Sequence, residues 1–308
     1  MKKFLSVVLV ALTLVALCIP GWAEEPEEAV DYPLNAEPAM DMSLETFAKN
    51  NKITEEPTFD EAPAVEPYSP EVHYRTIFGE DGFDLQPVNL VSFYPDSAIA
   101  KIVVHFRCGC AGQGTGFMVS AEGLMTAAHC LVCDEHHKTA DSLTFYFGYI
   151  NSKKYDYKYD GEVTFWYGTD FSKGPGSEWD YGYVKFKKRI GGRTGWFGLW
   201  ALPGEELNGL HCLVHGYRGD SLLWDMGKIS VFTPYLLKSR IDLLPGMSGG
   251  PVSCLVMDHG IYYYAVGINV GETAQANYAR RITSELISEM EENGLFDRGM
   301  TGDAFPKP

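Results

Sequence analysis

The sequence is poor in positive charge and, beyond its first 23 residues, in long apolar runs. Its 308 residues include 25 Lys and Arg against 41 Asp and Glu, a formal net charge of −16. Proteins that bind the phosphate backbone of nucleic acids need a basic surface, so nucleic acid is not an expected partner. No later segment is apolar enough to span a membrane. The 45% of hydrophobic residues can still bury a core, which excludes disorder of the whole chain.

The apolar run at the N-terminus is too short to span a membrane. Two lysines precede Phe4–Ile19, a run of 16 residues, whereas a transmembrane helix needs roughly 20. Gly21 and Ala23 then place small residues three and one positions before a possible cleavage point. The pattern predicts a secretory signal peptide over 1–23. We therefore expect a secreted, extracellular protein with no membrane attachment after signal removal.

The segment 24–76 is predicted to be an acidic, proline-rich propeptide or linker. Between Glu24 and Glu71 there are 14 acidic residues, two lysines and seven prolines. This composition is typical of a solvated segment that folds poorly. As a propeptide it would keep the protein a zymogen, and as a linker it would only be a spacer. The sequence leaves both interpretations open.

Beyond Ile77 the sequence changes to short β-branched and aromatic runs separated by Gly, Asn and Asp. Many short strands with this spacing indicate an all-β sandwich or barrel. Thr283 can cap a helix over about 283–293 that ends at Asn293-Gly294. The predicted strands cover 99–106, 116–120, 143–147, 163–167, 181–186, 212–217, 236–241, 251–257, 261–268 and 277–281.

Three local sequences together form a candidate catalytic constellation. His129 ends an apolar strand, Asp180 starts an alternating one, and Ser248 lies in a glycine-rich turn, with separations of 51 and 68 residues. A serine hydroxyl is a weak nucleophile at neutral pH, so it needs a general base such as His129. Asp180 would orient that imidazole. The amides of Gly246 and Ser248 could form an oxyanion hole.

These motifs resemble those of the trypsin-like serine endopeptidases, and most closely the secreted bacterial glutamyl endopeptidase, or V8-like, branch. The resemblance runs from about Ile77 to Glu292 and includes Gly114-Thr115-Gly116-Phe117 and the run from Val214 to Asp220. It implies an all-β fold of two six-stranded antiparallel β-barrels, at about 77–190 and 205–282, with a C-terminal helix at about 283–293. The whole protease domain would cover 77–308.

The resemblance also implies a function. It predicts a monomeric, secreted serine endopeptidase that hydrolyses peptide bonds of protein or peptide substrates through an acyl-enzyme and needs no cofactor. A second interpretation is a catalytically silent binding protein on a protease scaffold, against which the intact triad argues. A third is an exported zinc protein organised by cysteines, which metal analysis would separate.

The residues expected around the specificity pocket depart from the family. Glutamyl enzymes have a Thr or Ser and a His where this chain has Leu243 and Asn269, so selection of glutamate loses both side-chain donors. Asp242 stands where trypsin selects Lys or Arg, but it could equally tie a loop. Glu272, just after the pocket residue Gly271, disfavours an acidic substrate side chain. A basic or small apolar residue before the cut is therefore at least as well supported as strict glutamate specificity.

Activation also differs from trypsin. Trypsin pairs its freed N-terminus with an Asp directly before the nucleophile, whereas this chain has Met247 there. Trypsin's activation switch is therefore absent. Arg75-Thr76-Ile77 offers a processing point.

Six cysteines remain after signal removal. The resemblance implies a Cys212–Cys254 disulfide. The other four, Cys108, Cys110, Cys130 and Cys133, form either two bridges or a four-thiolate zinc site, and export favours bridges. Trypsin's partner for the cysteine after its histidine is replaced here by Gly114, so Cys130 is expected to pair with Cys108 or Cys110. His136 and His137 are best explained as residues of a solvated loop, and no metal ligand is predicted.

Overall fold

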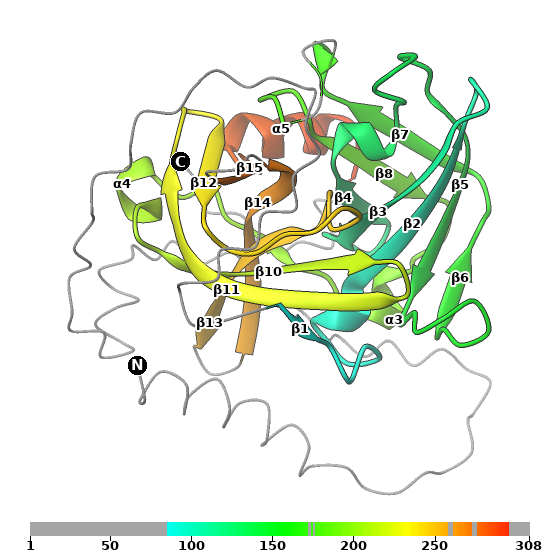
Figure 1. Cartoon of the computed structure of the whole chain (residues 1–308), viewed down its shortest axis with the longest axis horizontal. Helices are drawn as coiled ribbons and strands as arrows, with labels where there is room; N and C mark the ends of the chain where they lie inside the picture. Colours follow the sequence, from blue (N-terminus) through cyan, green and yellow to red (C-terminus); the bar gives the residue numbers. More distant parts are fainter. Residues whose placement is uncertain (1–84, 172–173, 175, 258–260, 273–275, 296–308) are drawn as a thin grey trace, which may run out of the picture. The chain divides into compact units, whose positions relative to one another are not determined.

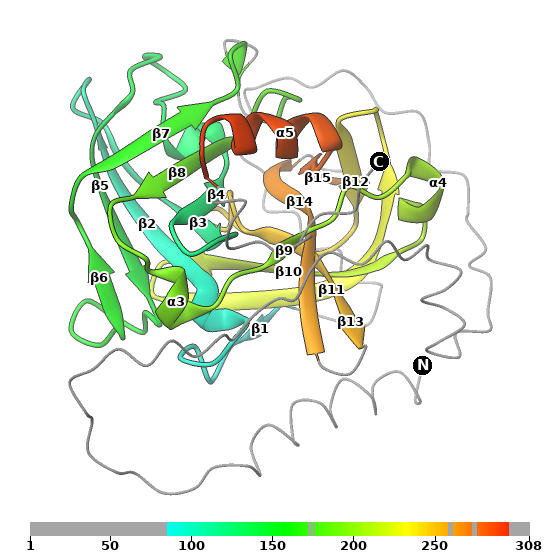
Figure 2. The same cartoon turned by 180° about the vertical axis from the view of Figure 1, so that it is seen from behind.

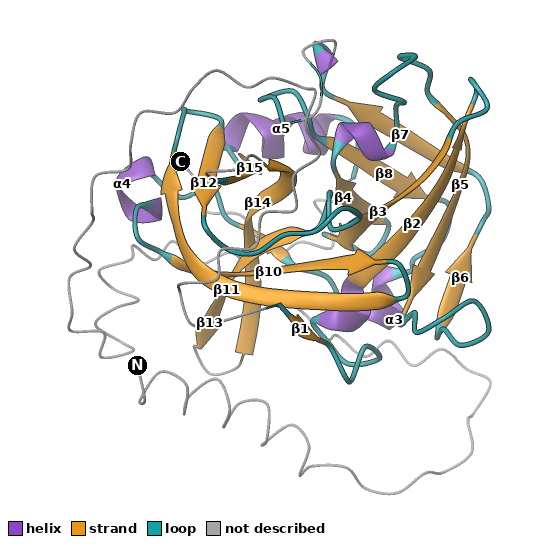
Figure 3. Ribbon diagram, in the orientation of Figure 1, coloured by secondary structure: helices purple, strands orange, loops and turns teal. Residues whose placement is uncertain are grey.

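Strands dominate the structure, and its helices are short (Figure 3). The computed structural model describes residues 85–171, 174, 176–257, 261–272 and 276–295. The predicted signal peptide, the acidic segment 24–76 and the processing point lie outside the described residues. Within those ranges no helix combines the length and the apolar character needed to cross a membrane.

The first sheet is antiparallel and curled, with the strand order β6-β5-β2-β3-β4-β8-β7 (Figure 1). Alternation along β5 turns Leu143, Phe145 and Phe147 inward, and the ring of Phe145 packs edge-to-face on Phe186 at 4.9 Å between centroids. Its strands are β2 (Ile99–Phe106), β3 (Ala111–Met118), β4 (Gly123–Thr126), β5 (Ala140–Phe147), β6 (Tyr157–Tyr159), β7 (Val163–Tyr167) and β8 (Gly182–Phe186).

The second sheet closes into a six-stranded barrel of order β11-β10-β13-β14-β15-β12, because β12 pairs again with β11. A short strand, β1 (Gln86–Pro87), pairs with the edge of β11, and β9 (Gly198–Leu199) pairs in parallel with β14. The barrel strands are β10 (His211–Arg218), β11 (Ser221–Val231), β12 (Leu236–Ser239), β13 (Pro251–Met257), β14 (Ile261–Glu272) and β15 (Asn277–Arg281). Its interior is apolar, with Val214, Ile229, Val252 and Val266 buried.

Helix α5 (Ser284–Glu292) follows the second barrel in sequence but is fixed to the first sheet. The Glu289 carboxylate accepts hydrogen bonds from the hydroxyls of Tyr181 (2.9 Å) and Tyr183 (3.0 Å). Thr283 caps the helix by accepting from the Leu286 amide, as predicted. Figure 2 shows α5 beside β15 and reaching toward β8. The other short helices are η1 (Asp96–Ala98), η2 (Ala128–Cys130), α3 (Gly191–Thr194) and α4 (Gly204–Leu207).

A buried lysine joins β2 to the turn between β10 and β11. Lys101 is 6% exposed, and its Nζ lies 3.1 Å from Asp220 Oδ1 and over the ring of Tyr149. The Tyr149 hydroxyl also donates to Asp220, and the Tyr149 amide donates to the Tyr217 hydroxyl. A buried ammonium without a partner costs free energy of folding. The contact of Lys101 with Asp220 therefore holds β2 of the first sheet against the β10–β11 turn of the second.

The predicted fold class is confirmed: the structure is mostly β, with a curled first sheet, a second sheet that closes into a six-stranded barrel, and a C-terminal helix. The predicted strands 99–106, 163–167, 251–257 and 277–281 coincide with β2, β7, β13 and β15. Strand β11 was not predicted. Its centre contains Asp225 and Gly227, which interrupt the hydrophobic pattern, but Asp225 is fully buried and accepts hydrogen bonds from the amides of Met226 and Asp242.

Candidate active site

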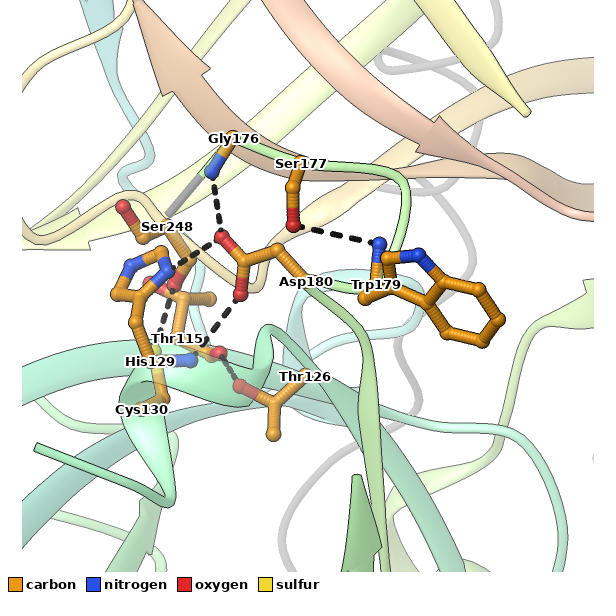
Figure 4. Close-up of polar contacts among 9 residues, drawn as sticks. All are labelled: Thr115, Thr126, His129, Cys130, Gly176, Ser177, Trp179, Asp180 and Ser248. Carbon is orange, nitrogen blue, oxygen red and sulfur yellow. Dashed lines mark hydrogen bonds and ion pairs between the residues drawn. The ribbon is translucent and has the colours of Figure 1, made fainter. Parts of the chain in front are cut away.

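His129 lies in η2, directly after the buried strand β4. Its Nδ1 is 2.8 Å from Asp180 Oδ2, and its own backbone N–H donates to Asp180 Oδ1 at 3.1 Å (Figure 4). A proton on Nδ1 that faces the carboxylate leaves the lone pair on Nε2. The first sheet therefore presents an imidazole that is held in the tautomer a general base needs.

Asp180 precedes β8 and is fully buried. Besides both hydrogen bonds from His129, its Oδ2 accepts the N–H of Gly176 at 2.8 Å. Three donors thus fix the orientation of one carboxylate, and Figure 4 shows them converging on it. The structure places His129 and Asp180, both singled out in the sequence, in contact. No signal in the sequence indicated Gly176.

The electrostatics of His129 follow from these neighbours. Burial alone lowers the pKa of an imidazole, because it disfavours the charged form. The adjacent Asp180 carboxylate, together with the neighbouring Cys130 thiol, outweighs that effect and holds the pKa of His129 well above its ordinary value. The pair is therefore arranged to stabilise an imidazolium once a proton has been taken up.

Ser248 lies in the loop that leads into β13. Its carbonyl accepts the N–H of Thr115 on β3 at 2.8 Å and the Cys130 thiol at 3.6 Å, so the loop lies against the first sheet and next to η2. Among the described residues no hydrogen bond joins Ser248 Oγ to His129. Free enzymes often form that hydrogen bond well only once substrate is bound.

The glycines beside Ser248 are required by close backbone contacts. Gly246 has φ +101°, and a Cβ there would lie 2.7 Å from the carbonyl oxygen of Tyr217. Gly249 has φ +85°, and a Cβ there would meet the Thr115 carbonyl at 2.1 Å. Within the part of the chain that the structure describes, neither the Gly246 nor the Ser248 amide donates a hydrogen bond. The oxyanion hole expected from these two amides stays a prediction.

Thr115 ties the two sheets together at this point. It is fully buried; its hydroxyl donates to the Gly246 carbonyl and accepts the Tyr217 amide, both at 2.8 Å. Its carbonyl accepts the hydroxyl of Thr126 at 2.7 Å. Sequence reasoning missed this role, because a threonine in a strand is ordinary and only a contact with the serine loop distinguishes this one.

The predicted pocket residues separate into two groups. Leu243 and Asn269 line one small internal cavity together with Asn277, and the Asn269 side-chain N–H2 and the Asn277 side-chain oxygen each lack a partner atom within the described structure. Asp242 does not line that cavity; it is fully buried, and its amide donates to Asp225 at 2.7 Å.

Gly271, the remaining predicted pocket residue, and the adjacent Glu272 end β14, and neither lines that cavity. A Cβ on Gly271 would lie 3.1 Å from the Cα of Gly176, so this strand passes close to the segment before Asp180. Burial raises the pKa of Glu272 to about 7. Its carboxylate is therefore partly charged at neutral pH.

The cysteines have a different arrangement from the predicted one. All six described cysteines are free thiols in this structure. Cys212 and Cys254 are both buried, and the register of β10 on β13 places them opposite each other. Burial raises the pKa of Cys254 to about 12. Their predicted disulfide is not formed here and stays a prediction.

The other four cysteines do not lie together in one cluster. The thiol of Cys130 faces the Ser248 carbonyl, whereas Cys108, Cys110 and Cys133 gather with His136 so that their ligand atoms all lie within 4.8 Å of one another. The expectation that Cys130 pairs with Cys108 or Cys110 therefore finds no support in the structure. His136 is exposed as expected of a loop residue, but its Nδ1 faces thiols rather than solvent alone.

The sequence is similar to a known peptidase domain and to two bacterial proteases. The model of the trypsin-like peptidase domain matches residues 114–254. A glutamyl endopeptidase from Bacillus licheniformis is 28% identical over 212 residues, which cover 67% of this chain and 63% of the relative. A protein from Bacillus subtilis named as an extracellular metalloprotease is 24% identical over 209 residues, 66% of each chain. The match spans less than two thirds of either relative.

Solved structures support the same fold. A Glu endopeptidase structure determined with MPD matches with a TM-score of 0.57 at 19% identity, covering 71% of this chain and 98% of that one. The protease Anisep from Arthrobacter nicotinovorans matches with a TM-score of 0.54 at 19% identity, covering 68% and 98%. At these identities the likeness establishes the two-sheet architecture alone.

Proposed function

This chain is a chymotrypsin-fold serine peptidase close to the glutamyl endopeptidases, and we propose that it is a secreted endopeptidase that cleaves peptide bonds through Ser248. The observation that carries the proposal is the contact of the partly exposed His129 with the fully buried Asp180, next to a serine loop in which neither the Gly246 nor the Ser248 amide has a recorded acceptor. Each half supplies one part of the chemistry. A binding protein on the same scaffold would have no use for this combination.

In the proposed reaction, Ser248 Oγ attacks the carbonyl carbon of the peptide bond and transfers its proton to His129 Nε2. The carbonyl oxygen becomes an oxyanion that the amides of Gly246 and Ser248 bind; one such donor is typically worth about 3 to 4 kcal/mol in the transition state. The imidazolium, stabilised by Asp180, protonates the leaving amine as the C–N bond breaks. Water then attacks the acyl-enzyme, with His129 again taking the proton, and releases the carboxylate.

The test of this proposal is the Ser248→Ala variant of the processed chain. We expect peptide cleavage to fall by about 10⁴-fold or more, because the nucleophile is gone, with folding unchanged because only one small polar atom is lost. Ser221→Ala, an exposed serine at the start of β11, is the matched control and should keep full activity. Equal activity in the two variants would overturn the proposal.

For specificity, we propose that the pocket selects an uncharged side chain before the cleaved bond. Two observations support this: Leu243, Asn269 and Asn277 line the cavity while Asp242 does not, and Glu272 disfavours an acidic group. A set of peptides that differ only in that residue tests it, with Leu and Gln expected to be cleaved faster than Arg and Glu. Fastest cleavage after Glu would establish a strict glutamyl enzyme instead.

The alternative role of Asp242 has its own variant. Asp242→Ser should leave the ranking of those peptides unchanged if the carboxylate only supports the loop near Asp225. A preference for Arg or Lys that this substitution removes would assign Asp242 to the base of the pocket.

The remaining features of the proposal rest on the sequence. Export follows from the signal peptide over 1–23, and the Bacillus subtilis relative is named as extracellular. We further propose that the enzyme acts as a monomer on protein or peptide substrates, that the acidic segment keeps it a zymogen until cleavage near Ile77, and that Cys212 and Cys254 form a disulfide after export. The mass of the secreted protein, with and without reduction, tests the last two points.

A further inference from the structure

A group of four potential metal ligands lies on the first sheet, outside the proposed catalytic site. The thiols of Cys108, Cys110 and Cys133 and the imidazole of His136 have ligand atoms that all lie within 4.8 Å of one another. His136 Nδ1 is 3.5 Å from the Sγ of Cys110 and 3.6 Å from that of Cys133. The only other charged group recorded near this nitrogen among the described residues is Glu135, with Oε2 at 3.9 Å.

We propose that these four residues form a structural zinc site. Zn–S bonds of about 2.3 Å and Zn–N bonds of about 2.0 Å in a tetrahedron put a sulfur and a nitrogen ligand about 3.5 Å apart. Both measured sulfur–nitrogen distances agree with that edge length. Three thiolates and one histidine are a closed ligand set, which is typical of zinc that holds structure rather than zinc that binds substrate.

The backbone prepares both halves of this site. Gly109 has φ +91°, so the chain turns tightly between the two cysteines, and the turn is closed by the N–H of Phe106 donating to the Cys110 carbonyl at 2.8 Å. The second loop is closed by hydrogen bonds between Cys133 and both His137 and Lys138, each 2.8 Å long.

The two loops are also held next to each other. The Arg107 amide donates to the Thr139 carbonyl at 3.1 Å, directly beside the pairing of β2 with β5. The four ligands therefore converge because the sheet brings their loops together, not because of one flexible side chain.

The number of thiols argues against disulfides here. Cys130, the fourth member of the predicted set, faces the Ser248 loop instead. Three thiols allow one disulfide and leave one cysteine over, whereas a metal uses all three together with the imidazole. In this location zinc would brace the hairpin between β2 and β3 against the loop that follows η2, and η2 carries His129. Because metal binding to a closed site contributes to folding, the site would stabilise the first sheet.

The test uses the full chain with Ser248→Ala, so that self-cleavage cannot occur, expressed in zinc-supplemented medium. We expect about one zinc per chain by elemental mass spectrometry after gel filtration, and free thiols at the three cysteines only after a chelator is added. Replacement of zinc by Co²⁺ should produce a thiolate-to-cobalt charge-transfer absorption. A chelator should also lower the melting temperature.

Matched variants assign the ligands. His136→Asn should lose zinc at least about tenfold in affinity, since it removes a direct ligand, whereas His137→Asn changes the neighbouring histidine, whose φ of +50° asparagine tolerates, and should keep it. Cys110→Ser should lose both zinc and the cobalt absorption. If loss of metal prevents folding, His136→Cys supplies a fourth thiolate and should restore zinc and the folded state.

Three results would overturn the proposal. The first is a chain without zinc whose mass and peptide map place a disulfide among Cys108, Cys110 and Cys133. The second is zinc that is bound equally by His136→Asn and His137→Asn. The third is zinc that remains in Cys110→Ser. None of these results depends on peptidase activity, so the proposed function stands or falls separately.

Discussion

The first sheet holds the proposed general base and its carboxylate partner through side-chain hydrogen bonds, whereas the second barrel holds the proposed nucleophile through backbone conformation. In the first sheet, the carboxylate of Asp180 receives three hydrogen bonds, two of them from His129. In the second barrel, Gly246 and Gly249 adopt positive φ values in close contact with neighbouring carbonyls. The position of His129 in the first sheet therefore depends on the charged Asp180 side chain. The position of Ser248 in the second barrel depends on glycines that have no side chain.

The largest expected effect comes from breaking the charged arrangement. Asp180→Asn keeps the shape of the side chain but removes its charge and an acceptor, so His129 loses its orientation and the stabilisation of its imidazolium. We expect kcat to fall by about 10⁴-fold, measured with a peptide substrate at pH 7. Asp160→Asn, an exposed surface change, is the control. A loss of less than about tenfold, within the scale of ordinary hydrogen bonds, would contradict the assignment.

The corresponding change in the second barrel is Gly246→Ala. The added Cβ would lie 2.7 Å from the Tyr217 carbonyl, so the turn must shift and the oxyanion amide moves with it. We expect kcat to fall about 10²- to 10³-fold. Gly219→Ala is the matched control, because that glycine also has a positive φ but has no atom within 4 Å of an added Cβ. If both variants lost the same activity, backbone strain alone would explain the effect.

Thr115 tests the link between the two halves. Thr115→Val keeps the shape but leaves the Gly246 carbonyl and the Tyr217 amide without their buried partner. We expect a loss of about 2 to 4 kcal/mol in the free energy of unfolding, from denaturant titration. Thr164→Val makes the same chemical change at an exposed position of β7 and should cost little. Equal stability of the two variants would remove Thr115 from its linking role.

The pH dependence sharpens the comparison further, because the proposed general base, His129, lies in the first sheet. His129 must be neutral to accept a proton, and the Asp180 carboxylate raises its pKa. Activity should therefore fall as the pH drops through a midpoint above the ordinary histidine value of about 6.5.

The same measurement on Asp180→Asn supplies the check. Removing the carboxylate should move the midpoint in kcat/KM to lower pH. The buried His215, whose pKa burial lowers to about 4, cannot produce a limb in this range. An identical midpoint in wild type and variant would show that another group titrates.

Much of the fold could be predicted because several strands carry an uninterrupted hydrophobic pattern. Strands β2, β7, β13 and β15 were predicted within their observed bounds. Strand β11 could not be, because its buried Asp225 accepts a hydrogen bond from the neighbouring Met226 amide and another from the Asp242 amide, which only the fold brings into place. A buried charge of this kind looks like a loop residue until its partners are known.

The candidate site shows the same division. His129, Asp180 and Ser248 could be found from their local sequences, and the structure brings the first two into contact. The roles of Thr115 and His136 depend on contacts across strands, with Ser248 and with Cys110, so no local pattern indicates them. Sequence spacing grouped four cysteines together. In the fold, the pairing of β2 with β5 places two loops side by side, and only the cysteines of those loops come together.

The central claim is that Ser248 is an activated nucleophile. The most direct measurement is intact-mass spectrometry of the chain, trimmed near Ile77, before and after reaction with a fluorophosphonate, followed by peptide mapping. We predict one adduct, on Ser248, and none in Asp180→Asn at the same exposure. No adduct on the trimmed wild-type chain, or an adduct on another residue, would contradict the account and leave a folded scaffold without peptidase chemistry.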